Sequence, residues 1–113
     1  MGFTDRFKRN KKSNVSSKGN VSNAEFFKNM YNGFGGSNAN LGQPEMNTLL
    51  QHIMKWKMAA PNDLNCDLAV LLLNARKKSS GEIRSAVAKA KSEKTADDPS
   101  LTSWFEIEIN KVI

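Results

Sequence analysis

Residues 64–75 read LNCDLAVLLLNA, and this stretch decides the fold class of the chain. Apolar side chains recur along it at helical spacing, and Val70 and Leu73 extend the apolar stripe almost around the helix. The stripe itself consists of Leu64, Leu68, Leu71, Leu72 and Ala75. Because a helix that is apolar on nearly every side has to be surrounded by other elements, we expect this one to be central and buried in an all-α domain.

Amphipathic segments on both sides of this stretch predict its neighbours. Upstream, Pro44 suits the first turn of a helix that ends before Pro61. Downstream, Ser79 and Glu82 form a capping box that begins another helix. The apolar residues of these two helices are Met46, Leu49, Leu50, Ile53 and Trp56 in the first, and Ile83, Ala86, Val87 and Ala90 in the second. We therefore expect residues 44–113 to form a globular domain, a small three- to four-helix bundle.

The last segment of the chain, residues 101–113, carries two patterns. Asp98 and Pro99 provide a cap and a first-turn proline for a helix. The run from Phe105 to Ile109 alternates apolar and acidic residues, as a strand does. We favour the helix because of its cap, with the strand as the alternative.

The positive charge of the chain is concentrated at its N-terminus. The chain has 17 Lys and Arg residues against 11 Asp and Glu residues, a net charge of +6. Residues 1–20 alone carry six bases and one acid, which leaves +1 for the other 93 residues. Residues 10–23 contain no aromatic residue and no leucine, so they cannot bury enough surface to offset the entropy of ordering. We expect residues 1–21 to be a flexible, disordered basic arm.

Nucleic acid is the first partner that we expect for this arm, because basic residues gain affinity by neutralising phosphates and releasing their counterions. An anionic membrane surface is the second, since Phe3 and Phe7 would share one side of a short helix. A third interpretation is that the arm only keeps the chain soluble. The predicted nucleic-acid-binding residues are Arg6, Lys8, Arg9, Lys11, Lys12 and Lys18 in the arm, with Arg84 and Lys89 in the domain.

A short aromatic helix is predicted between the arm and the domain, over residues 22–32. Ser22 and Glu25 form its capping box. A helix of this length is unstable in water unless its aromatic side packs on something else, so we expect it to dock on the core or on a partner. The predicted docking residues are Phe26, Phe27, Met30 and Tyr31. Residues 33–43, GFGGSNANLGQ, have the composition of a flexible linker and mark a boundary.

The order of helices between Glu45 and Lys94 resembles that of helix-turn-helix DNA-binding domains. The residues that carry the resemblance are Leu68-Ala69 and Leu72 before the turn, and Ile83-Arg84 and Ala86-Val87 after it. The resemblance implies a recognition helix that presents Ser80, Glu82, Arg84, Ser85 and Lys89 to the DNA groove, with Phe105 to Ile109 as the wing of the winged variant. A plain helix bundle is the alternative that we favour, because Arg76 to Ser80 form a longer turn than that family uses.

Several classes of function are excluded by residue counts. A single cysteine, Cys66, cannot form an intramolecular disulfide, and a single histidine, His52, cannot build a metal site. We find no phosphate-binding glycine loop and no acid and base pair, and so expect no enzyme, no metal and no cofactor. The longest apolar run, Leu68 to Leu73, is too short to cross a bilayer. Without a secretory signal, we expect an intracellular (cytoplasmic) or virion setting and not a secreted protein.

The sequence therefore predicts a non-enzymatic, basic protein associated with nucleic acid. In this interpretation the arm gives electrostatic affinity and the helical domain gives fold or specificity. The alternative is a small structural or adaptor subunit of a larger assembly, such as a phage or virus particle, whose arm and aromatic helix become ordered against neighbouring subunits. Steep salt dependence of binding to DNA or RNA favours the first hypothesis, and defined oligomers favour the second.

Overall fold

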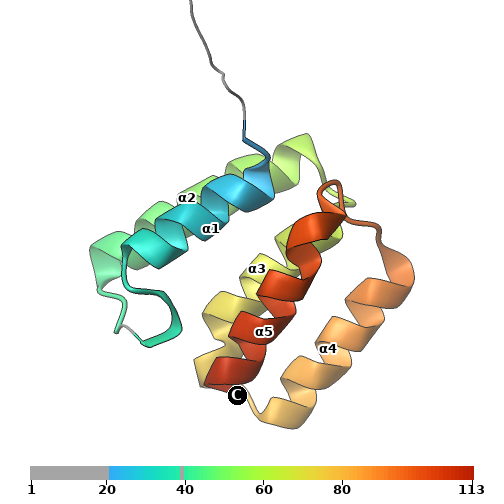
Figure 1. Cartoon of the computed structure of the whole chain (residues 1–113). Helices are drawn as coiled ribbons and strands as arrows, with labels where there is room; N and C mark the ends of the chain where they lie inside the picture. The colour runs from blue at the N-terminus through green and yellow to red at the C-terminus, as the bar shows by residue number, and fades with distance from the viewer. Residues whose placement is uncertain (1–20, 39) are drawn as a thin grey trace, which may run out of the picture.

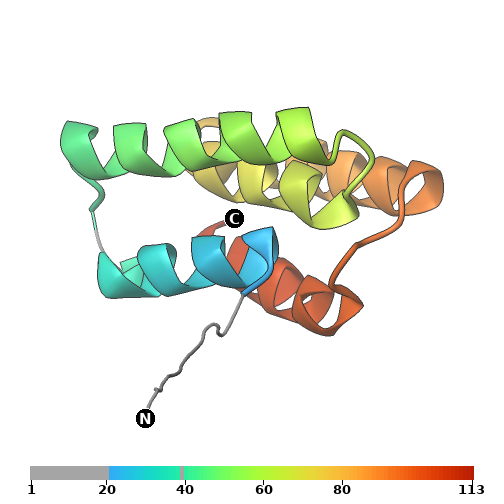
Figure 2. The same ribbon diagram turned by 90° about the horizontal axis from the view of Figure 1, so that it is seen from above.

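The computed structural model of the chain describes residues 21–38 and 40–113. Within these residues it contains five α-helices and no strand (Figure 1). The helices are α1 (Asn23–Gly33), α2 (Gln43–Ala59), α3 (Leu64–Asn74), α4 (Ser80–Glu93) and α5 (Thr102–Val112). Seen from above, α2, α3 and α4 form one layer, and α1 and α5 form the other (Figure 2). The predicted all-α fold is confirmed, while the predicted arm lies, except for Val21, outside the described residues.

Ser22 and Ser79 cap two of the helices at the predicted positions, although for Ser22 only the bond from the Glu25 amide, half of the predicted capping box, is present. The Ser22 hydroxyl accepts the amide hydrogen of Glu25 at 3.1 Å and caps α1. Ser79 and Glu82 form a complete capping box at the start of α4. Side-chain oxygens satisfy amide groups that have no partner within the helix, which is why these two residues fix where α1 and α4 begin.

The C-terminal segment is a helix, so the strand alternative and the wing are both wrong. A 3-10 turn, η3 (Pro99–Leu101), leads directly into α5. Phe105 and Ile109 are one helical turn apart and are both buried, whereas Ile107 between them is exposed. Burial thus follows the period of a helix rather than that of a strand, because the segment packs its Phe105 side against the core.

The core lies between the two layers and around the inner side of α3. Leu68, Ala69 and Leu72 of α3 are buried there together with Phe105 of α5 and Ile83 of α4. The expectation that α3 is central is confirmed on this side. Val70 and Leu71, however, are only partly buried. The prediction of burial almost all round therefore holds only in part: α2 and α4 flank α3, and no helix of the described residues lies over the face between them.

A cluster of aromatic rings attaches α1 to the rest of the chain. Phe27 of α1 lies with its ring centroid 5.7 Å from that of Phe105 and 6.4 Å from that of Trp56. Tyr31 meets Trp104 edge to face at 5.9 Å. Such pairs stabilise packing beyond the area that they bury. The aromatic side of the short helix therefore packs on the chain's own core. This is one of the two alternatives, core or partner, that we gave for a helix too short to be stable alone.

The glycine-rich segment after α1 is tied to the core by hydrogen bonds. It contains a 3-10 turn, η1 (Gly36–Asn38). The Ser37 hydroxyl donates to Glu108 Oε1 at 2.6 Å, so the Tyr31 hydroxyl must be the donor in its 3.3 Å contact with Ser37 Oγ. The Arg76 guanidinium donates to the backbone oxygen of Ser37. Because Ala24, Phe27 and Tyr31 belong to the same core as the later helices, the core does not divide at this segment.

A buried polar junction joins α2, α3 and the segment before α5. Asp63 accepts hydrogen bonds from Trp56 Nε1 at 2.8 Å, from the Asn65 amide at 3.0 Å and from the Asp97 amide at 3.1 Å. The Asn65 side chain donates to the backbone oxygen of Asp98 at 2.8 Å and accepts from Thr102 Oγ1 at 2.9 Å. Both side chains are buried, and these partners satisfy the hydrogen bonds that burial demands.

Candidate interaction surfaces

Arg84 and Lys89, the two predicted nucleic-acid contacts of the domain, lie on opposite flanks of α4. Arg84 lines a cavity of about 240 Å³ between α4 and α5, together with Glu106. Lys89 lines a different cavity, between α4 and α3, together with Leu71. Five residues on a helix correspond to a rotation of about 140°, which separates the two side chains. The structure therefore does not bring them together in one site.

The two helices that resemble a helix-turn-helix motif, α3 and α4, run in opposite directions (Figure 1) and pack against each other in one layer (Figure 2). A 3-10 turn, η2 (Ala75–Lys77), followed by Lys78 and Ser79, connects α3 to α4. In a DNA-binding helix-turn-helix unit the second helix crosses the first steeply. The arrangement seen here is that of an antiparallel helical hairpin, in which α4 packs along α3.

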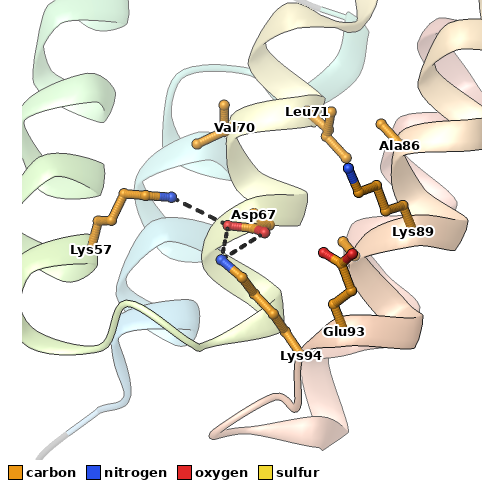
Figure 3. A pocket seen from close by; sticks show the side chains of 9 residues that line it. Lys57, Asp67, Val70, Leu71, Ala86, Lys89, Glu93 and Lys94 are labelled. Atoms are coloured by element: carbon orange, nitrogen blue, oxygen red, sulfur yellow. Dashed lines mark hydrogen bonds and ion pairs between the residues drawn. The ribbon is translucent and has the colours of Figure 1, made fainter.

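A groove runs along the outer side of this hairpin, facing away from α1 and α5 (Figure 3). We call it the outer groove and define it by its apolar floor: Val70 and Leu71 of α3 with Ala86 and Ala90 of α4. Its first hollow has a volume of about 360 Å³. A second hollow of about 650 Å³ shares Leu71 and Ala86 with the first and extends to Gly81 at the start of α4.

Charged side chains stand along both edges of the outer groove. Asp67 forms ion pairs with Lys57 of α2 at 3.3 Å and with Lys94, which follows the last residue of α4, at 3.0 Å (Figure 3). The other charged residues that line the two hollows are Lys78, Glu82, Lys89 and Glu93. The four lysines and three acids leave a net charge of +1. Hydrogen bonds from Ser79 lower the pKa of Glu82, so that this acid stays ionised near neutral pH.

An apolar stripe is exposed on α2. Leu50, Met54 and Met58 recur every four residues, and their exposed fractions are 41%, 66% and 85%. Residues four apart lie on one face of a helix, so the three form a continuous row. Leu50 was expected in the core, and that prediction is wrong: Leu49 and Ile53 occupy the core side of α2 and turn Leu50 toward the surface. The four-residue spacing of Leu50, Met54 and Met58 was visible in the sequence and signals this row.

The four predicted docking residues on α1 have different environments. Phe27 and Tyr31 are buried in the core, and Met30 packs partly against it. Phe26 remains 47% exposed and lies with its ring centroid 4.8 Å from that of His52. The prediction that Phe27 and Tyr31 dock on a partner is therefore wrong. Both are core residues, because α2 and α5 supply the aromatic surface that they require. Of the four, Phe26 alone remains about half exposed.

Cys66 and His52 have structural surroundings. Burial raises the pKa of the Cys66 thiol to about 11, and a protonated thiol is a poor nucleophile. His52 Nε2 lies 3.0 Å from the backbone oxygen of Asn23, within hydrogen-bond distance, and its ring also contacts Trp56. Both residues thus serve the packing of α1, α2 and α3, as a lone cysteine and a lone histidine suggest.

Three further observations bear on the class of protein. In the part of the chain that the structure describes, no three His, Cys, Asp or Glu side chains gather closely enough to hold a metal ion. None of the helices in that part combines the length and the hydropathy needed to cross a bilayer. No protein-family model, curated protein sequence or solved structure matches the chain. Its function is therefore inferred from its own charges, burial and contacts.

Proposed function

We propose that the protein is a small, non-enzymatic, nucleic-acid-associated protein whose N-terminal residues supply the affinity. The observation that carries this proposal is the distribution of charge, +5 over residues 1–20 and +1 over the remaining 93 residues. A charge density of this kind favours phosphate binding through counterion release, which depends on the number of charges and not on base sequence. The helical domain then acts as the folded unit that carries the basic segment.

The charges of the helical domain support this division of labour. Four of its lysines, at positions 57, 91, 94 and 111, are already paired with Asp67, Glu106 or Glu108. Arg84 and Lys89 point to opposite sides of α4 and form no common surface for a groove of DNA. A domain of this kind contributes scattered phosphate contacts, which position a nucleic acid without reading its sequence.

Deletion of residues 1–20 tests the proposal. Binding of the full chain and of the deletion variant to duplex DNA and to single-stranded RNA is followed by fluorescence anisotropy between 50 and 200 mM salt, roughly the range over which phosphate contacts weaken. We expect the full chain to bind with steep salt dependence, and the logarithmic slope to shrink by up to about 5 on deletion. The melting temperature should not change, because the deleted residues precede α1 and its cap.

The matched control is the Arg84→Ala, Lys89→Ala double variant with the N-terminal residues intact. This variant should lose little affinity, and the loss should be the same for every DNA sequence. A deletion variant that binds as tightly as the full chain overturns the proposal. A strong, sequence-dependent loss in the double variant would instead show that α4 reads bases. Binding to anionic lipid vesicles is measured in parallel. If the membrane alternative is right, the full chain should bind the vesicles more tightly than it binds nucleic acid.

A second candidate is favoured by the exposed row Leu50, Met54 and Met58. Single exposed apolar residues are common, but a contiguous row marks a contact with another protein. The protein would then be a structural or adaptor subunit of a larger assembly, such as a phage or virus particle. Sedimentation of the full chain and of Met54→Lys tests this: oligomers that the substitution converts into monomers support it, and a monomer at every concentration counts against it.

A further inference from the structure

We propose that the outer groove is a docking site for an amphipathic helix of a partner protein that carries carboxylates beside its apolar face. The inference goes beyond the nucleic-acid proposal and does not depend on the N-terminal residues. It rests on three features of the hairpin of α3 and α4: an apolar floor that none of the described helices covers, the length of the groove, and a lysine that pairs with none of the described acids.

The floor of the groove is the side of α3 that α1, α2, α4 and α5, the other helices of the described residues, leave open. Val70 and Leu71 are large aliphatic residues that pack only partly against the core, and Ala86 faces them from α4. A helix that is apolar on nearly every side normally has neighbours all round. α3 has neighbours on its inner side and at its two edges, so the remaining side is the one that a partner would complete.

The dimensions of the groove suit a helix. Its two hollows share Leu71 and Ala86 and therefore form one continuous depression, of about 360 and 650 Å³. The depression follows α4 from Gly81 to Lys94, which is about 20 Å at the helical rise per residue. A partner helix of about four turns would fill this length, with its apolar residues at three-four spacing in contact with the floor.

Lys89 indicates the charge of the partner. Among the residues that the structure describes, it forms no ion pair, although Glu93 stands one helical turn away. Figure 3 shows its side chain directed across the groove toward Leu71. A partner that covers the floor would remove water from this ammonium group, which costs free energy unless a carboxylate replaces the water. The partner therefore has to bring an acidic residue to this point.

The other lysines of the groove extend this requirement along its edges. Lys57 and Lys94 share a single carboxylate, that of Asp67, so the pair retains positive charge. Lys78 stands at the opposite end, beside Gly81. An acidic helix meets attractive charge along the groove. The closely spaced phosphates of a nucleic acid would also face Asp67, Glu82 and Glu93, whereas a helix can place its few carboxylates at the lysines alone. A second copy of this chain would bring lysines against lysines.

The test uses the full chain labelled with ¹⁵N and a synthetic probe, a peptide of about four helical turns. The peptide is built from Leu, Ala and Glu, with its leucines at three-four spacing. We expect the amide signals of Val70, Leu71, Ala86 and Lys89 to shift on titration. A peptide with every Glu replaced by Lys should bind about three- to ten-fold more weakly, because rim ion pairs are individually weak but here act together.

A charge exchange makes the test specific. Lys89→Glu should weaken binding of the acidic peptide and strengthen binding of the basic one. Arg84→Glu, on the other flank of α4, should leave both affinities unchanged. Equal affinities for the acidic and basic peptides, or shifts confined to other surfaces, overturn the proposal. Concentration-dependent broadening of the groove signals without peptide also overturns it, since a second copy would then be the occupant.

Discussion

Leu71 and Leu72 are neighbours in the same helix and have the same side chain, yet they belong to different parts of the molecule. Leu72 points toward the core and is almost completely buried. Leu71 is only partly buried and lines both hollows of the outer groove. Successive residues on a helix point about 100° apart, so Leu72 lies on the side of Tyr31 and Met46 while Leu71 faces the gap between α2 and α4.

This difference shows that the inner side of α3 stabilises the fold, whereas its outer side contributes less to stability. On the inner side, close packing and satisfied hydrogen bonds stabilise the fold, and any lost group leaves a void or an unpaired polar atom. On the outer side, apolar and charged groups remain in contact with water and are available to other molecules. Substitutions on the two sides should therefore differ in their effect on stability, and this is what the following predictions test.

The largest effect is expected from Leu72→Ala. Removing this buried side chain loses its transfer free energy and leaves a cavity, at a cost of about 2–5 kcal/mol in the free energy of unfolding. The matched variant, Leu71→Ala, should cost under about 1.5 kcal/mol because water already reaches that site. Urea denaturation of both variants measures the difference. Equal losses would show that the two leucines share one environment and would break the comparison.

The next largest effect is expected from Asn65→Ala at the buried polar junction. The substitution removes the hydrogen bonds to the Asp98 backbone oxygen and from Thr102 Oγ1. The Asp98 oxygen keeps its bond from the Leu101 amide, while the partly buried Thr102 hydroxyl loses its acceptor. We expect a loss of about 1–3 kcal/mol, measured by thermal unfolding. Thr102→Val serves as a control that removes one partner only and should cost less. A neutral Asn65→Ala would mean that water enters the junction.

A smaller, pH-dependent effect is expected from Ser22→Ala. Hydrogen bonds from Ser100 and Ser22 lower the pKa of Asp98, so its ionised form is more stable in the folded chain than in the unfolded one. That contribution is present above the unfolded pKa of about 3.9 and is lost as the pH falls through the lower folded value.

Ser22→Ala should therefore cost about 0.5–2 kcal/mol at neutral pH, through loss of the α1 cap and of the bond to Asp98. Its disadvantage relative to the natural chain should shrink between about pH 4 and pH 2. Guanidinium denaturation at a series of pH values measures both. A disadvantage that does not vary with pH would mean that Ser22 acts only as a cap.

The smallest effect is expected on the outer side, from Asp67→Ala. Its ion pairs with Lys57 and Lys94 are partly exposed to water, and such pairs contribute under about 1 kcal/mol. The loss should diminish further at 1 M salt, where the screening length is about 3 Å. A cost comparable to that of Leu72→Ala would show that the outer side also supports the fold, and would remove the distinction between the two sides.

Much of the fold was predictable because its signals are local. Ser22 with Glu25 and Ser79 with Glu82 fix the beginnings of two helices through atoms only three residues apart. Apolar spacing predicted α2, α3 and α4. The helix favoured for the last segment is confirmed, but Asp98 and Pro99 begin the 3-10 turn before it, without a side-chain capping bond, and α5 begins at Thr102. The candidate groove was harder to predict, since the sequence placed Leu71 in the core and gave Arg84 and Lys89 a common role.

The charge of residues 1–20, the helical class and the capping positions are thus determined by the sequence alone, because each depends on composition or on neighbours within one helical turn. Tertiary structure decided which side of each helix is covered. Phe27 and Tyr31 became core residues because α5, more than 70 residues later, supplies Trp104 and Phe105. Leu71 became part of a groove because none of the helices in residues 21–38 and 40–113 packs over it. Burial depends on contacts between distant segments, which periodicity along a single helix does not encode.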